Sequence, residues 1–403
     1  MNRRSFIRTA LALPLARFEA LTAPRRNQVK ITAIKALQLR GHLNSVVRID
    51  TDAGLTGYGE AGLNGPMART WAGIFEKHLA GQDPLAIERH FEKMTAQVHP
   101  YLASIPAVSG VDMALWDLAG KITGQPVYSL LGGPFRDRIR LYVNSAARDM
   151  LDRAASRDWA QQLKREQWGW NAVKINVMHP LGRPTGPWEP VPMLRTEDFQ
   201  KVRLAFANAR EALGGEIDIM AHCHNEFDLP SAIGVARAVA PVNPYWLEDP
   251  LQVAYSDSWK TLHASAGVPL LTGEKLELPQ QFLPFLQNQA IDMLHVDLAF
   301  IGGITGARRV ADLARIYRLP IVCHNIGTLV LMMASAHFGA AIHDFIASEN
   351  VLGQGYYVET MAAGASPVVK AGFLLVPGEP GLGADLNPDI VRANLAPGEP
   401  WWN

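Results

Sequence analysis

Apolar and polar positions begin to alternate along the chain soon after its first 27 residues. The segments that carry this period-two pattern are 29–39, 46–50 and 55–59, with a turn at Asp52, Ala53 and Gly54 before the last. Such alternation predicts three strands paired in an antiparallel meander. Apolar residues then recur at helical spacing in 67–79, 85–98 and 107–122. We therefore predict an α+β domain over residues 28–135, ending where Gly132, Gly133 and Pro134 break the pattern.

From residue 138 onward the rhythm changes to short β-branched or apolar runs that alternate with amphipathic helical segments. These runs are 139–143, 172–177, 217–223, 245–248, 269–272, 291–296, 320–323 and 345–348. Parallel strands separated by helices in this way close into a barrel. We predict an α/β fold, a (β/α)₈ barrel over residues 136–370 with the N-terminal α+β domain as its cap. The Gly- and Pro-rich tail after Gly353, including residues 371–403, is expected to pack on the cap rather than add a helix.

Composition agrees with two domains and a small-molecule ligand. The 403 residues are 48% hydrophobic, which suits one barrel-sized domain and a companion. Lys+Arg and Asp+Glu are both 38 and no charged block stands out, so neither a nucleic acid nor a membrane surface is expected as a partner. Cys223 and Cys323 each lie in an apolar run and are expected to be free buried thiols.

The first residues resemble an export signal. Arg3 and Arg4 are followed by Ser5, Phe6 and Ile7 and by a weak apolar stretch, 9–16, which is typical of a twin-arginine signal. We assign residues 1–27 to this signal and expect a periplasmic protein. The alternative is a frayed basic terminus of a cytoplasmic protein, because Arg17 interrupts the apolar stretch without a clear cleavage site. No later segment has the roughly 18 unbroken apolar residues that a spanning helix needs.

Three potential metal ligands end consecutive strands of the predicted barrel. His222, Glu248 and Glu274 follow strands three, four and five at intervals of 26 residues. The carboxyl ends of adjacent barrel strands meet at one mouth, so we expect the three side chains to lie side by side. One acidic residue there would be explained as a cap of the next helix. Three in register favour a hard divalent cation such as Mg²⁺, which prefers oxygen ligands.

The chain also resembles a known family. The phrases that carry the resemblance are 51–60, Thr-Asp-Ala-Gly-Leu-Thr-Gly-Tyr-Gly-Glu, and 110–121, Gly-Val-Asp-Met-Ala-Leu-Trp-Asp-Leu-Ala-Gly-Lys, together with every strand end of the barrel. They resemble the enolase superfamily, in particular its mandelate racemase and acid-sugar dehydratase subgroup. The resemblance implies that the cap shields the barrel mouth, that Mg²⁺ holds the substrate carboxylate and stabilises an enediolate, and that the chain forms a homo-oligomer.

The resemblance also implies a base. In the subgroup a histidine on strand seven is oriented by an aspartate on strand six, and here these positions hold His324 and Asp297. The carboxylate would fix the imidazole tautomer and support its charged form. Racemases of the subgroup use Lys-x-Lys on strand two, whereas this chain has Lys174 and Asn176, which alternation places on the barrel interior. Lys174 can contact a carboxylate, but Asn176 offers only hydrogen bonds, so the second base of such a racemase is missing.

Two further residues match the dehydratase pattern. His224 lies two residues past the first ligand position. The galactonate dehydratase-type members, which the chain resembles here, have a histidine at that place that protonates the departing hydroxyl, and a loop histidine bonded to backbone is the alternative. Glu349, which ends strand eight, matches the family glutamate that hydrogen-bonds the substrate carboxylate. It could donate a proton only if burial and neighbouring charge raise its pKa, and an exposed surface glutamate is the other interpretation.

His222 departs from the family, in which the first metal ligand is an aspartate. An imidazole in its place removes one negative charge and one hard oxygen donor, and it suits transition metals better than Mg²⁺. We expect either weaker Mg²⁺ binding or a shift toward Mn²⁺ or another transition metal, unless His222 does not ligate at all. Asp218 is four residues earlier, toward the closed end of the barrel, and is not expected to replace it.

Two segments are expected to contact the distal part of the substrate. They are 40–45, between the first two cap strands, and 178–193 after strand two, with His179, Arg183, Trp188 and Glu189. An ordinary solvated loop is the alternative for both.

The predicted activity is dehydration of a sugar acid to a 2-keto-3-deoxy acid. His324 with Asp297 would remove the C2 proton, the metal and Lys174 would stabilise the enediolate, and His224 would protonate the leaving hydroxyl. The alternatives are racemisation or epimerisation of a 2-hydroxy acid with Lys174 as the opposite base, and a non-catalytic sugar-acid binding protein. A cycloisomerase is disfavoured. The cycloisomerase relatives have a lysine-bearing pattern on strand six, where this chain has Asp297.

Overall fold

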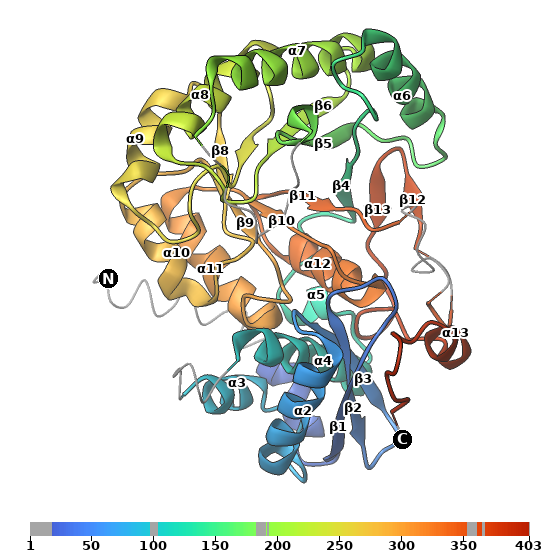
Figure 1. The fold of residues 1–403 in the computed structure, drawn as a ribbon. Coiled ribbons are helices and arrows are strands. Elements are labelled where there is room, and N and C mark those ends of the chain that lie inside the picture. Colours follow the sequence, from blue (N-terminus) through green and yellow to red (C-terminus); the bar gives the residue numbers. More distant parts are fainter. Residues whose placement is uncertain are drawn as a thin grey trace.

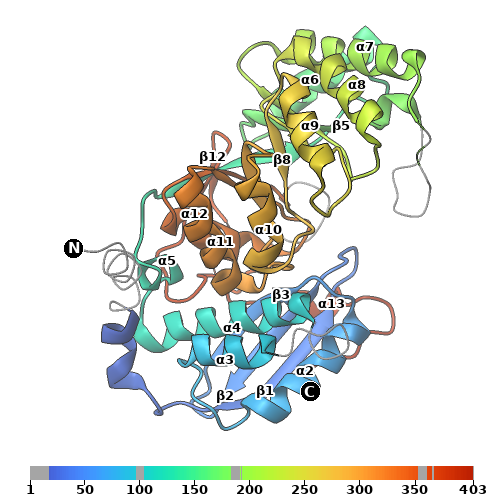
Figure 2. The same cartoon turned by 90° about the vertical axis from the view of Figure 1, so that its left-hand side faces the viewer.

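The computed structural model describes residues 18–96, 104–182, 191, 193–352, 361–364 and 367–402. Most of the predicted export signal, residues 1–17, lies outside this part of the chain, and export stays a prediction. In the described residues no helix combines the length and apolar character that crossing a membrane requires. A barrel lies above a smaller cap in Figure 1, and the chain ends beside the cap. Figure 2 shows the cap sheet and its helices below the barrel helices.

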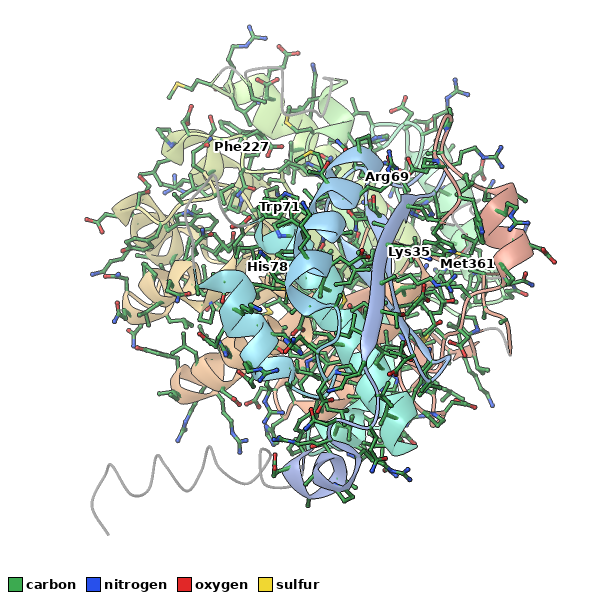
Figure 3. The ribbon with its side chains drawn as sticks, turned by 90° about the horizontal axis from the view of Figure 1, so that it is seen from below. Lys35, Arg69, Trp71, His78, Phe227 and Met361 are labelled. Carbon is green, nitrogen blue, oxygen red and sulfur yellow. The ribbon has the colours of Figure 1, made fainter. Side chains whose placement is uncertain are left out.

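The cap is an antiparallel sheet covered by helices, as predicted. Its strands β1 (Ile31–Gln38), β2 (Ser45–Thr51) and β3 (Thr56–Ala61) pair in that order. Its helices are α2 (Gly65–Leu79), α3 (Ile87–Thr95), α4 (Ile105–Thr123) and α5 (Val127–Leu130). In Figure 3, which views the molecule from below, Lys35 of β1 and Arg69, Trp71 and His78 of α2 lie in front of the barrel.

Close packing of β3 on α4 explains the two sequence phrases of the cap. A Cβ atom on Gly59 would lie 2.0 Å from the carbonyl oxygen of Gly110, so only glycine allows the strand to approach the helix this closely. A Cβ atom on Gly57 would likewise lie 2.3 Å from the carbonyl oxygen of Ala114. The glycines of residues 51–60 therefore serve the cap core.

Eight parallel strands close the barrel, because β11 pairs with β4 as well as with β10. They are β4 (Arg138–Asn144), β5 (Ala172–Asn176), β6 (Asp218–His222), β7 (Leu247–Glu248), β8 (Leu270–Thr272), β9 (Met293–Val296), β10 (Ile321–Cys323) and β11 (Phe345–Glu349). The surrounding helices are α6 (Arg153–Arg165), α7 (Thr196–Leu213), α8 (Leu229–Val239), α9 (Asp257–Ala266), α10 (Leu278–Gln287), α11 (Gly303–Tyr317) and α12 (Leu329–Ala341). Short 3-10 turns occupy Ala23–Arg25, His179–Leu181 and Ala240–Val242. The predicted (β/α)₈ barrel and its cap are confirmed.

One layer of mostly apolar side chains fills the barrel interior, with one member from each strand or, for Trp246, from the residue just before β7. Its members are Tyr142, Ala172, Met220, Trp246, Leu271, Met293, Val322 and Ala347. Strand side chains alternate with period two, so residues two positions later also point inward, closer to the carboxyl-end mouth. Most of these positions hold polar residues, and they form the floor of the candidate site.

The C-terminal tail differs partly from expectation. Leu395 bridges Leu39, and the Ala396 N–H donates to the carbonyl of Gln38, so the last residues do lie on the cap. However, the tail also contains α13 (Pro388–Ala393), which the Gly and Pro content did not predict, because Pro388 is tolerated at the first turn and Asn387 caps it. The hairpin of β12 (Val369–Lys370) and β13 (Phe373–Leu375) adds to the barrel sheet antiparallel to β4.

Cap side chains hold the starts of two barrel helices. Asp112 of α4 accepts hydrogen bonds from the backbone N–H of Thr305 at 2.9 Å and from its hydroxyl at 2.5 Å, at the start of α11. Glu60 of β3 accepts hydrogen bonds from the backbone N–H and the hydroxyl of Thr328, the residue that caps the start of α12. Both helices follow strands that carry candidate site residues, so the cap fixes the mouth as well as covering it.

Candidate active site

The predicted site residues gather at the carboxyl ends of the barrel strands. Fully or nearly fully buried there are Lys174, His222, Glu248, Glu274, His295, Asp297, His324 and Glu349. Each lies on, or just after, a different strand from β5 to β11, except His295 and Asp297, which share β9 and its end. A buried cluster of this kind is stable only if its charges and polar atoms find partners.

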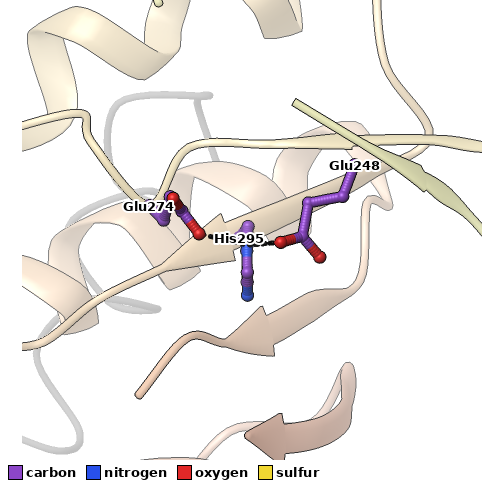
Figure 4. A group of neighbouring side chains, drawn as sticks. All are labelled: Glu248, Glu274 and His295. Carbon is purple, nitrogen blue, oxygen red and sulfur yellow. Dashed lines mark ion pairs between the residues drawn. The ribbon is translucent and has the colours of Figure 1, made fainter. Parts of the chain in front are cut away.

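Glu248, Glu274 and His295 form a compact group of possible ligands. One ligand atom from each of the three lies within 4.8 Å of the other two. Among the described residues, this is the group of three or more His, Cys, Asp or Glu side chains whose ligand atoms lie this close together. Nδ1 of His295 is 3.6 Å from Oε2 of Glu274 and 3.9 Å from Oε1 of Glu248. Figure 4 shows the imidazole between the two carboxylates.

His222 is not a member of this group, so its role as third ligand stays a prediction. It pairs in register with Glu248 across β6 and β7, and its ring centroid lies 4.8 Å from that of His224. Its Nε2 atom is buried and has no hydrogen-bond partner among the described residues. Burial, reinforced by the charge of Lys174, holds the pKa of His222 well below its usual range, so the imidazole is neutral.

The donor set of this cluster fits a divalent cation. The carboxylates of Glu248 and Glu274 lie on either side of the His295 ring, and burial holds the pKa of His295 well below its usual range, so this imidazole is neutral too. Two ring nitrogens, Nε2 of His222 and Nδ1 of His295, lack hydrogen-bond partners in the described structure. A cation would satisfy Nδ1 of His295 and the two carboxylates together, whereas His222 is not a member of this compact group.

Lys174 lies on β5, across the barrel from β9, and its ammonium sits between two carboxylates. Its Nζ atom is 3.0 Å from Oε1 of Glu248 and 3.0 Å from Oε1 of Glu349. Burial opposes the charged form, but the charges of Glu248, Glu349 and Glu274 outweigh it and raise the pKa of Lys174. The side chain is therefore a fixed ammonium inside the site, as suits a group that contacts an anion.

His324 and Asp297 are in direct contact. Nδ1 of His324 lies 2.6 Å from Oδ2 of Asp297, and the other carboxylate oxygen accepts the N–H of Ala299 at 2.7 Å. Nε2 of His324 faces the site, 3.4 Å from Glu274 and 3.7 Å from Glu349. Burial acts against the imidazolium, but Glu274, the hydrogen bond to Asp297 and Glu349 together raise the pKa of His324 to about 9. With these carboxylates as its neighbours the ring is protonated at neutral pH, and Nε2 is the nitrogen that it directs into the site.

The remaining predicted residues have different surroundings. Glu349 is buried rather than exposed, with Lys174 beside it and the Tyr142 hydroxyl 3.4 Å away. The Asn176 side chain accepts the N–H of Met178 at 2.7 Å and so supports the following turn. His224 is exposed at the mouth, and partial desolvation there lowers its pKa to about 4. An anionic substrate beside His224 would raise this pKa, and His224 needs that effect to hold a proton.

Sequence reasoning missed His295 and Tyr142. His295 is completely buried, and its Nε2 atom lies 3.0 Å from the hydroxyl of Tyr142 on β4. The alternation that placed Lys174 and Asn176 on one face also places His295 on the face of Asp297, so His295 could have been found. Tyr142 belongs to the apolar layer of the barrel, and nothing in its sequence context marks it as polar in function.

The two segments expected near the distal substrate differ in their surroundings. Residues 40–45 lie over the loop after β10, because backbone groups of Ile326 and Gly327 hydrogen-bond to His42 and Asn44 donates to Glu60. In the second segment Arg183, Trp188 and Glu189 lie outside the described residues. His179 is within them, and its Nε2 atom lies 2.8 Å from the carbonyl oxygen of Ala147.

Comparison with known proteins agrees with this arrangement. Residues 155–390 match the family described as enolase C-terminal domain-like, and residues 24–132 match the N-terminal domain of mandelate racemase and muconate lactonizing enzyme. The D-xylonate dehydratase of Haloferax volcanii is 31% identical, over 94% of this chain and 92% of its own. The D-galactonate dehydratase of Ralstonia nicotianae is 28% identical, over 87% of this chain and 91% of its own.

Solved structures show the same fold. A mandelate racemase/muconate lactonizing enzyme-like protein from Rubrobacter xylanophilus has a TM-score of 0.83 and 29% identity, covering 93% of this chain and 99% of its own. An enolase from Agrobacterium radiobacter, with bound Na and L-malate, has a TM-score of 0.80 and 28% identity, covering 91% and 95%. The chain belongs to the enolase superfamily, in its mandelate racemase and acid-sugar dehydratase subgroup.

Proposed function

We propose that this protein is a metal-dependent hydro-lyase that dehydrates a sugar acid to a 2-keto-3-deoxy acid. The observation that carries the proposal is the placement of the His324–Asp297 pair across the barrel from the Lys174 ammonium. His324 can accept a proton from the substrate, while the Lys174 ammonium faces the negative charge that then forms on it. The relatives named above are dehydratases of D-xylonate and D-galactonate, which supports a sugar acid as the substrate class.

Glu248 and Glu274 would hold the metal, with an imidazole as a further ligand. When bound, a divalent cation supplies Lewis-acid stabilisation of the carboxylate oxygens as the α-proton leaves. Mg²⁺ is the ion that the family resemblance implies, whereas the imidazoles favour Mn²⁺ or another transition metal. The L-malate in the Agrobacterium radiobacter structure is a 2-hydroxy acid, which supports binding of such a group in this fold.

The protein side chains divide the reaction between them. The neutral form of His324 accepts the C2 proton at Nε2, while Asp297 holds its tautomer and stabilises the imidazolium. The C–H electron pair passes into the carboxylate, and the Lys174 ammonium faces the resulting enediolate. As those electrons return, the C3–O bond breaks, and His224 gives its proton to the hydroxyl, which leaves as water. The enol product then tautomerises to the 2-keto acid.

The charge of Lys174 disfavours racemisation. A second base must be neutral to accept a proton from the opposite face, but the carboxylates of Glu248 and Glu349 keep this ammonium protonated. Asn176, the other interior residue of β5, has no basic group. Dehydration needs only a fixed positive charge at this side of the site, which Lys174 provides.

Proton NMR of an acid-sugar library in D₂O tests the proposal. The library should contain xylonate, galactonate, gluconate and mannonate, with Mg²⁺ and then Mn²⁺ added. We expect loss of the C2 proton and the appearance of a C3 CHD signal of a 2-keto-3-deoxy acid, because the enol takes its new C3 hydrogen from D₂O. Deuterium exchange at C2 without a keto product would instead identify a racemase or epimerase. Binding of metal and acid without any exchange would identify a binding protein.

A further inference from the structure

We propose that His295 is a protein ligand of the metal held by Glu248 and Glu274, and that Tyr142 orients its imidazole for this role. This inference rests on the metal dependence in the proposed function, which the family resemblance assigns to strands three, four and five. His295 lies on strand six, outside that set. Its side chain is completely buried, and its Nδ1 atom has no hydrogen-bond partner in the described structure.

The distances around Nδ1 suit a shared cation better than a hydrogen bond. Nδ1 is 3.6 Å from Glu274 and 3.9 Å from Glu248, beyond the roughly 2.7–3.2 Å of an N–H···O bond. Ligands about 2.1 Å from one ion are separated by roughly 3.0–3.4 Å. A modest contraction of the group would therefore bring all three atoms onto one cation.

Tyr142 sets the tautomer that ligation needs. Its hydroxyl lies 3.0 Å from Nε2 of His295 and donates to the carbonyl oxygen of Cys323 at 3.2 Å. A hydroxyl has only one hydrogen to donate. Because Tyr142 donates that hydrogen to the carbonyl of Cys323, its hydroxyl oxygen accepts the Nε2–H of His295. Nδ1 then carries a lone pair directed toward the carboxylates. A metal-binding histidine typically has its other nitrogen fixed by such a partner.

The charge of the group leaves room for a cation. The ammonium groups that contact these two carboxylates are Lys174, on Glu248, and Lys275, on Glu274. Lys275 contacts Oε1 of Glu274, which leaves Oε2, the oxygen near Nδ1, to a cation. Lys174 contacts Oε1 of Glu248, so a cation would share that oxygen with the ammonium. A set of two carboxylates and an imidazole is suited to Mn²⁺, Fe²⁺, Co²⁺ or Zn²⁺ more than to Mg²⁺.

Pulsed EPR of the Mn²⁺-loaded full chain tests the assignment without measuring activity. A coordinated imidazole nitrogen modulates the electron spin echo, and growth on ¹⁵N-histidine distinguishes histidine from backbone nitrogen. We expect this modulation in the wild type and in His222→Gln, and its loss or strong reduction in His295→Gln. Titration followed by the free Mn²⁺ EPR signal should show about tenfold weaker binding, or weaker still, in His295→Gln.

Tyr142→Phe keeps His295 but removes the acceptor of its Nε2–H. This variant should retain the nitrogen modulation and bind Mn²⁺ about 10- to 100-fold more weakly. It also carries the test if His295→Gln fails to fold, as judged by circular dichroism.

The proposal is overturned if the modulation persists in His295→Gln and disappears in His222→Gln, or if neither His295→Gln nor Tyr142→Phe changes the Mn²⁺ affinity. In both cases the metal-dependent function would stand, with a different ligand. A wild-type protein that binds no divalent cation would contradict the proposed function itself.

Discussion

His324 and Asp297 meet through a 2.6 Å contact between Nδ1 and Oδ2, at the ends of neighbouring strands of the barrel. The contact leaves Nε2 of His324 as the one ring nitrogen available to a substrate. A hydrogen bond from Ala299 to the other oxygen of Asp297 fixes the carboxylate in turn. The pair therefore gives a proton acceptor with a defined tautomer and direction.

Asp297→Asn should lower kcat for dehydration by about 10²- to 10⁴-fold, because an amide cannot stabilise the imidazolium and can favour the wrong tautomer. The measurement is product formation together with C2 proton exchange in D₂O. Asp292→Asn is a matched control, since Asp292 contacts His263 at 3.1 Å at the other end of β9. Equal activity losses in both variants would refute a special role for Asp297.

Lys174→Met should reduce both activity and stability. Removing a buried ion-pair partner leaves Glu248 and Glu349 without their ammonium, which costs about 3–5 kcal/mol in typical cases. A bound divalent cation would offset part of this charge, so the loss in melting temperature should be smaller with Mn²⁺ than with EDTA. Thermal unfolding followed by circular dichroism checks both values. An identical loss under the two conditions would contradict a cation site beside Glu248.

Metal removal should raise the pKa of His324. Without a cation, Glu274 and its neighbours hold this pKa at about 9 against the effect of burial, so the imidazole stays protonated at neutral pH and cannot act as a base. A cation on Glu274 reduces that negative potential and should lower the pKa. Histidine ¹³C NMR titrations with EDTA and with Mg²⁺ measure the change, and His324→Asn assigns the signal. His337, buried in α12, is the reference that should not respond.

Much of the fold was predictable because it depends on local patterns. The eight runs of apolar residues correspond to the eight barrel strands, and the interval of 26 residues places Glu248 and Glu274 at adjacent strand ends. Alternation with period two also placed Lys174 on the barrel interior. Helix α13 was not predicted because Gly and Pro dominate the tail around it.

Contacts across the barrel could not be predicted in the same way. Alternation tells which face a side chain takes, but the tilt and stagger of the strands decide which side chains meet. Lys174 of β5 therefore contacts Glu349 of β11, and Tyr142 of β4 reaches His295 of β9, without a pattern that shows either pair. Alternation alone also does not choose between His222 and His295 as a metal ligand, because it places both side chains on the barrel interior.

Glu60 should make stability depend on pH near neutrality. Its buried carboxylate accepts hydrogen bonds from Thr328, at 3.0 Å from the N–H and 2.6 Å from the hydroxyl, and one from Asn44 at 3.1 Å. Burial nevertheless raises its pKa from 4.5 to about 7, because these bonds only partly replace water. The folded protein thus binds the proton more tightly than the unfolded chain does.

The unfolding free energy of the wild type, relative to Glu60→Gln, should therefore fall as pH rises from about 4.5 to about 7 and then level off, by roughly 3 kcal/mol at most. Urea unfolding at about pH 5, 6, 7 and 8 measures the difference. Asp112→Asn offers a parallel test, because burial also raises the pKa of Asp112 to about 7 at the start of α11. A difference that grows with pH would mean that Glu60 is stabilised as a carboxylate, and that its bonds to Thr328 outweigh its burial.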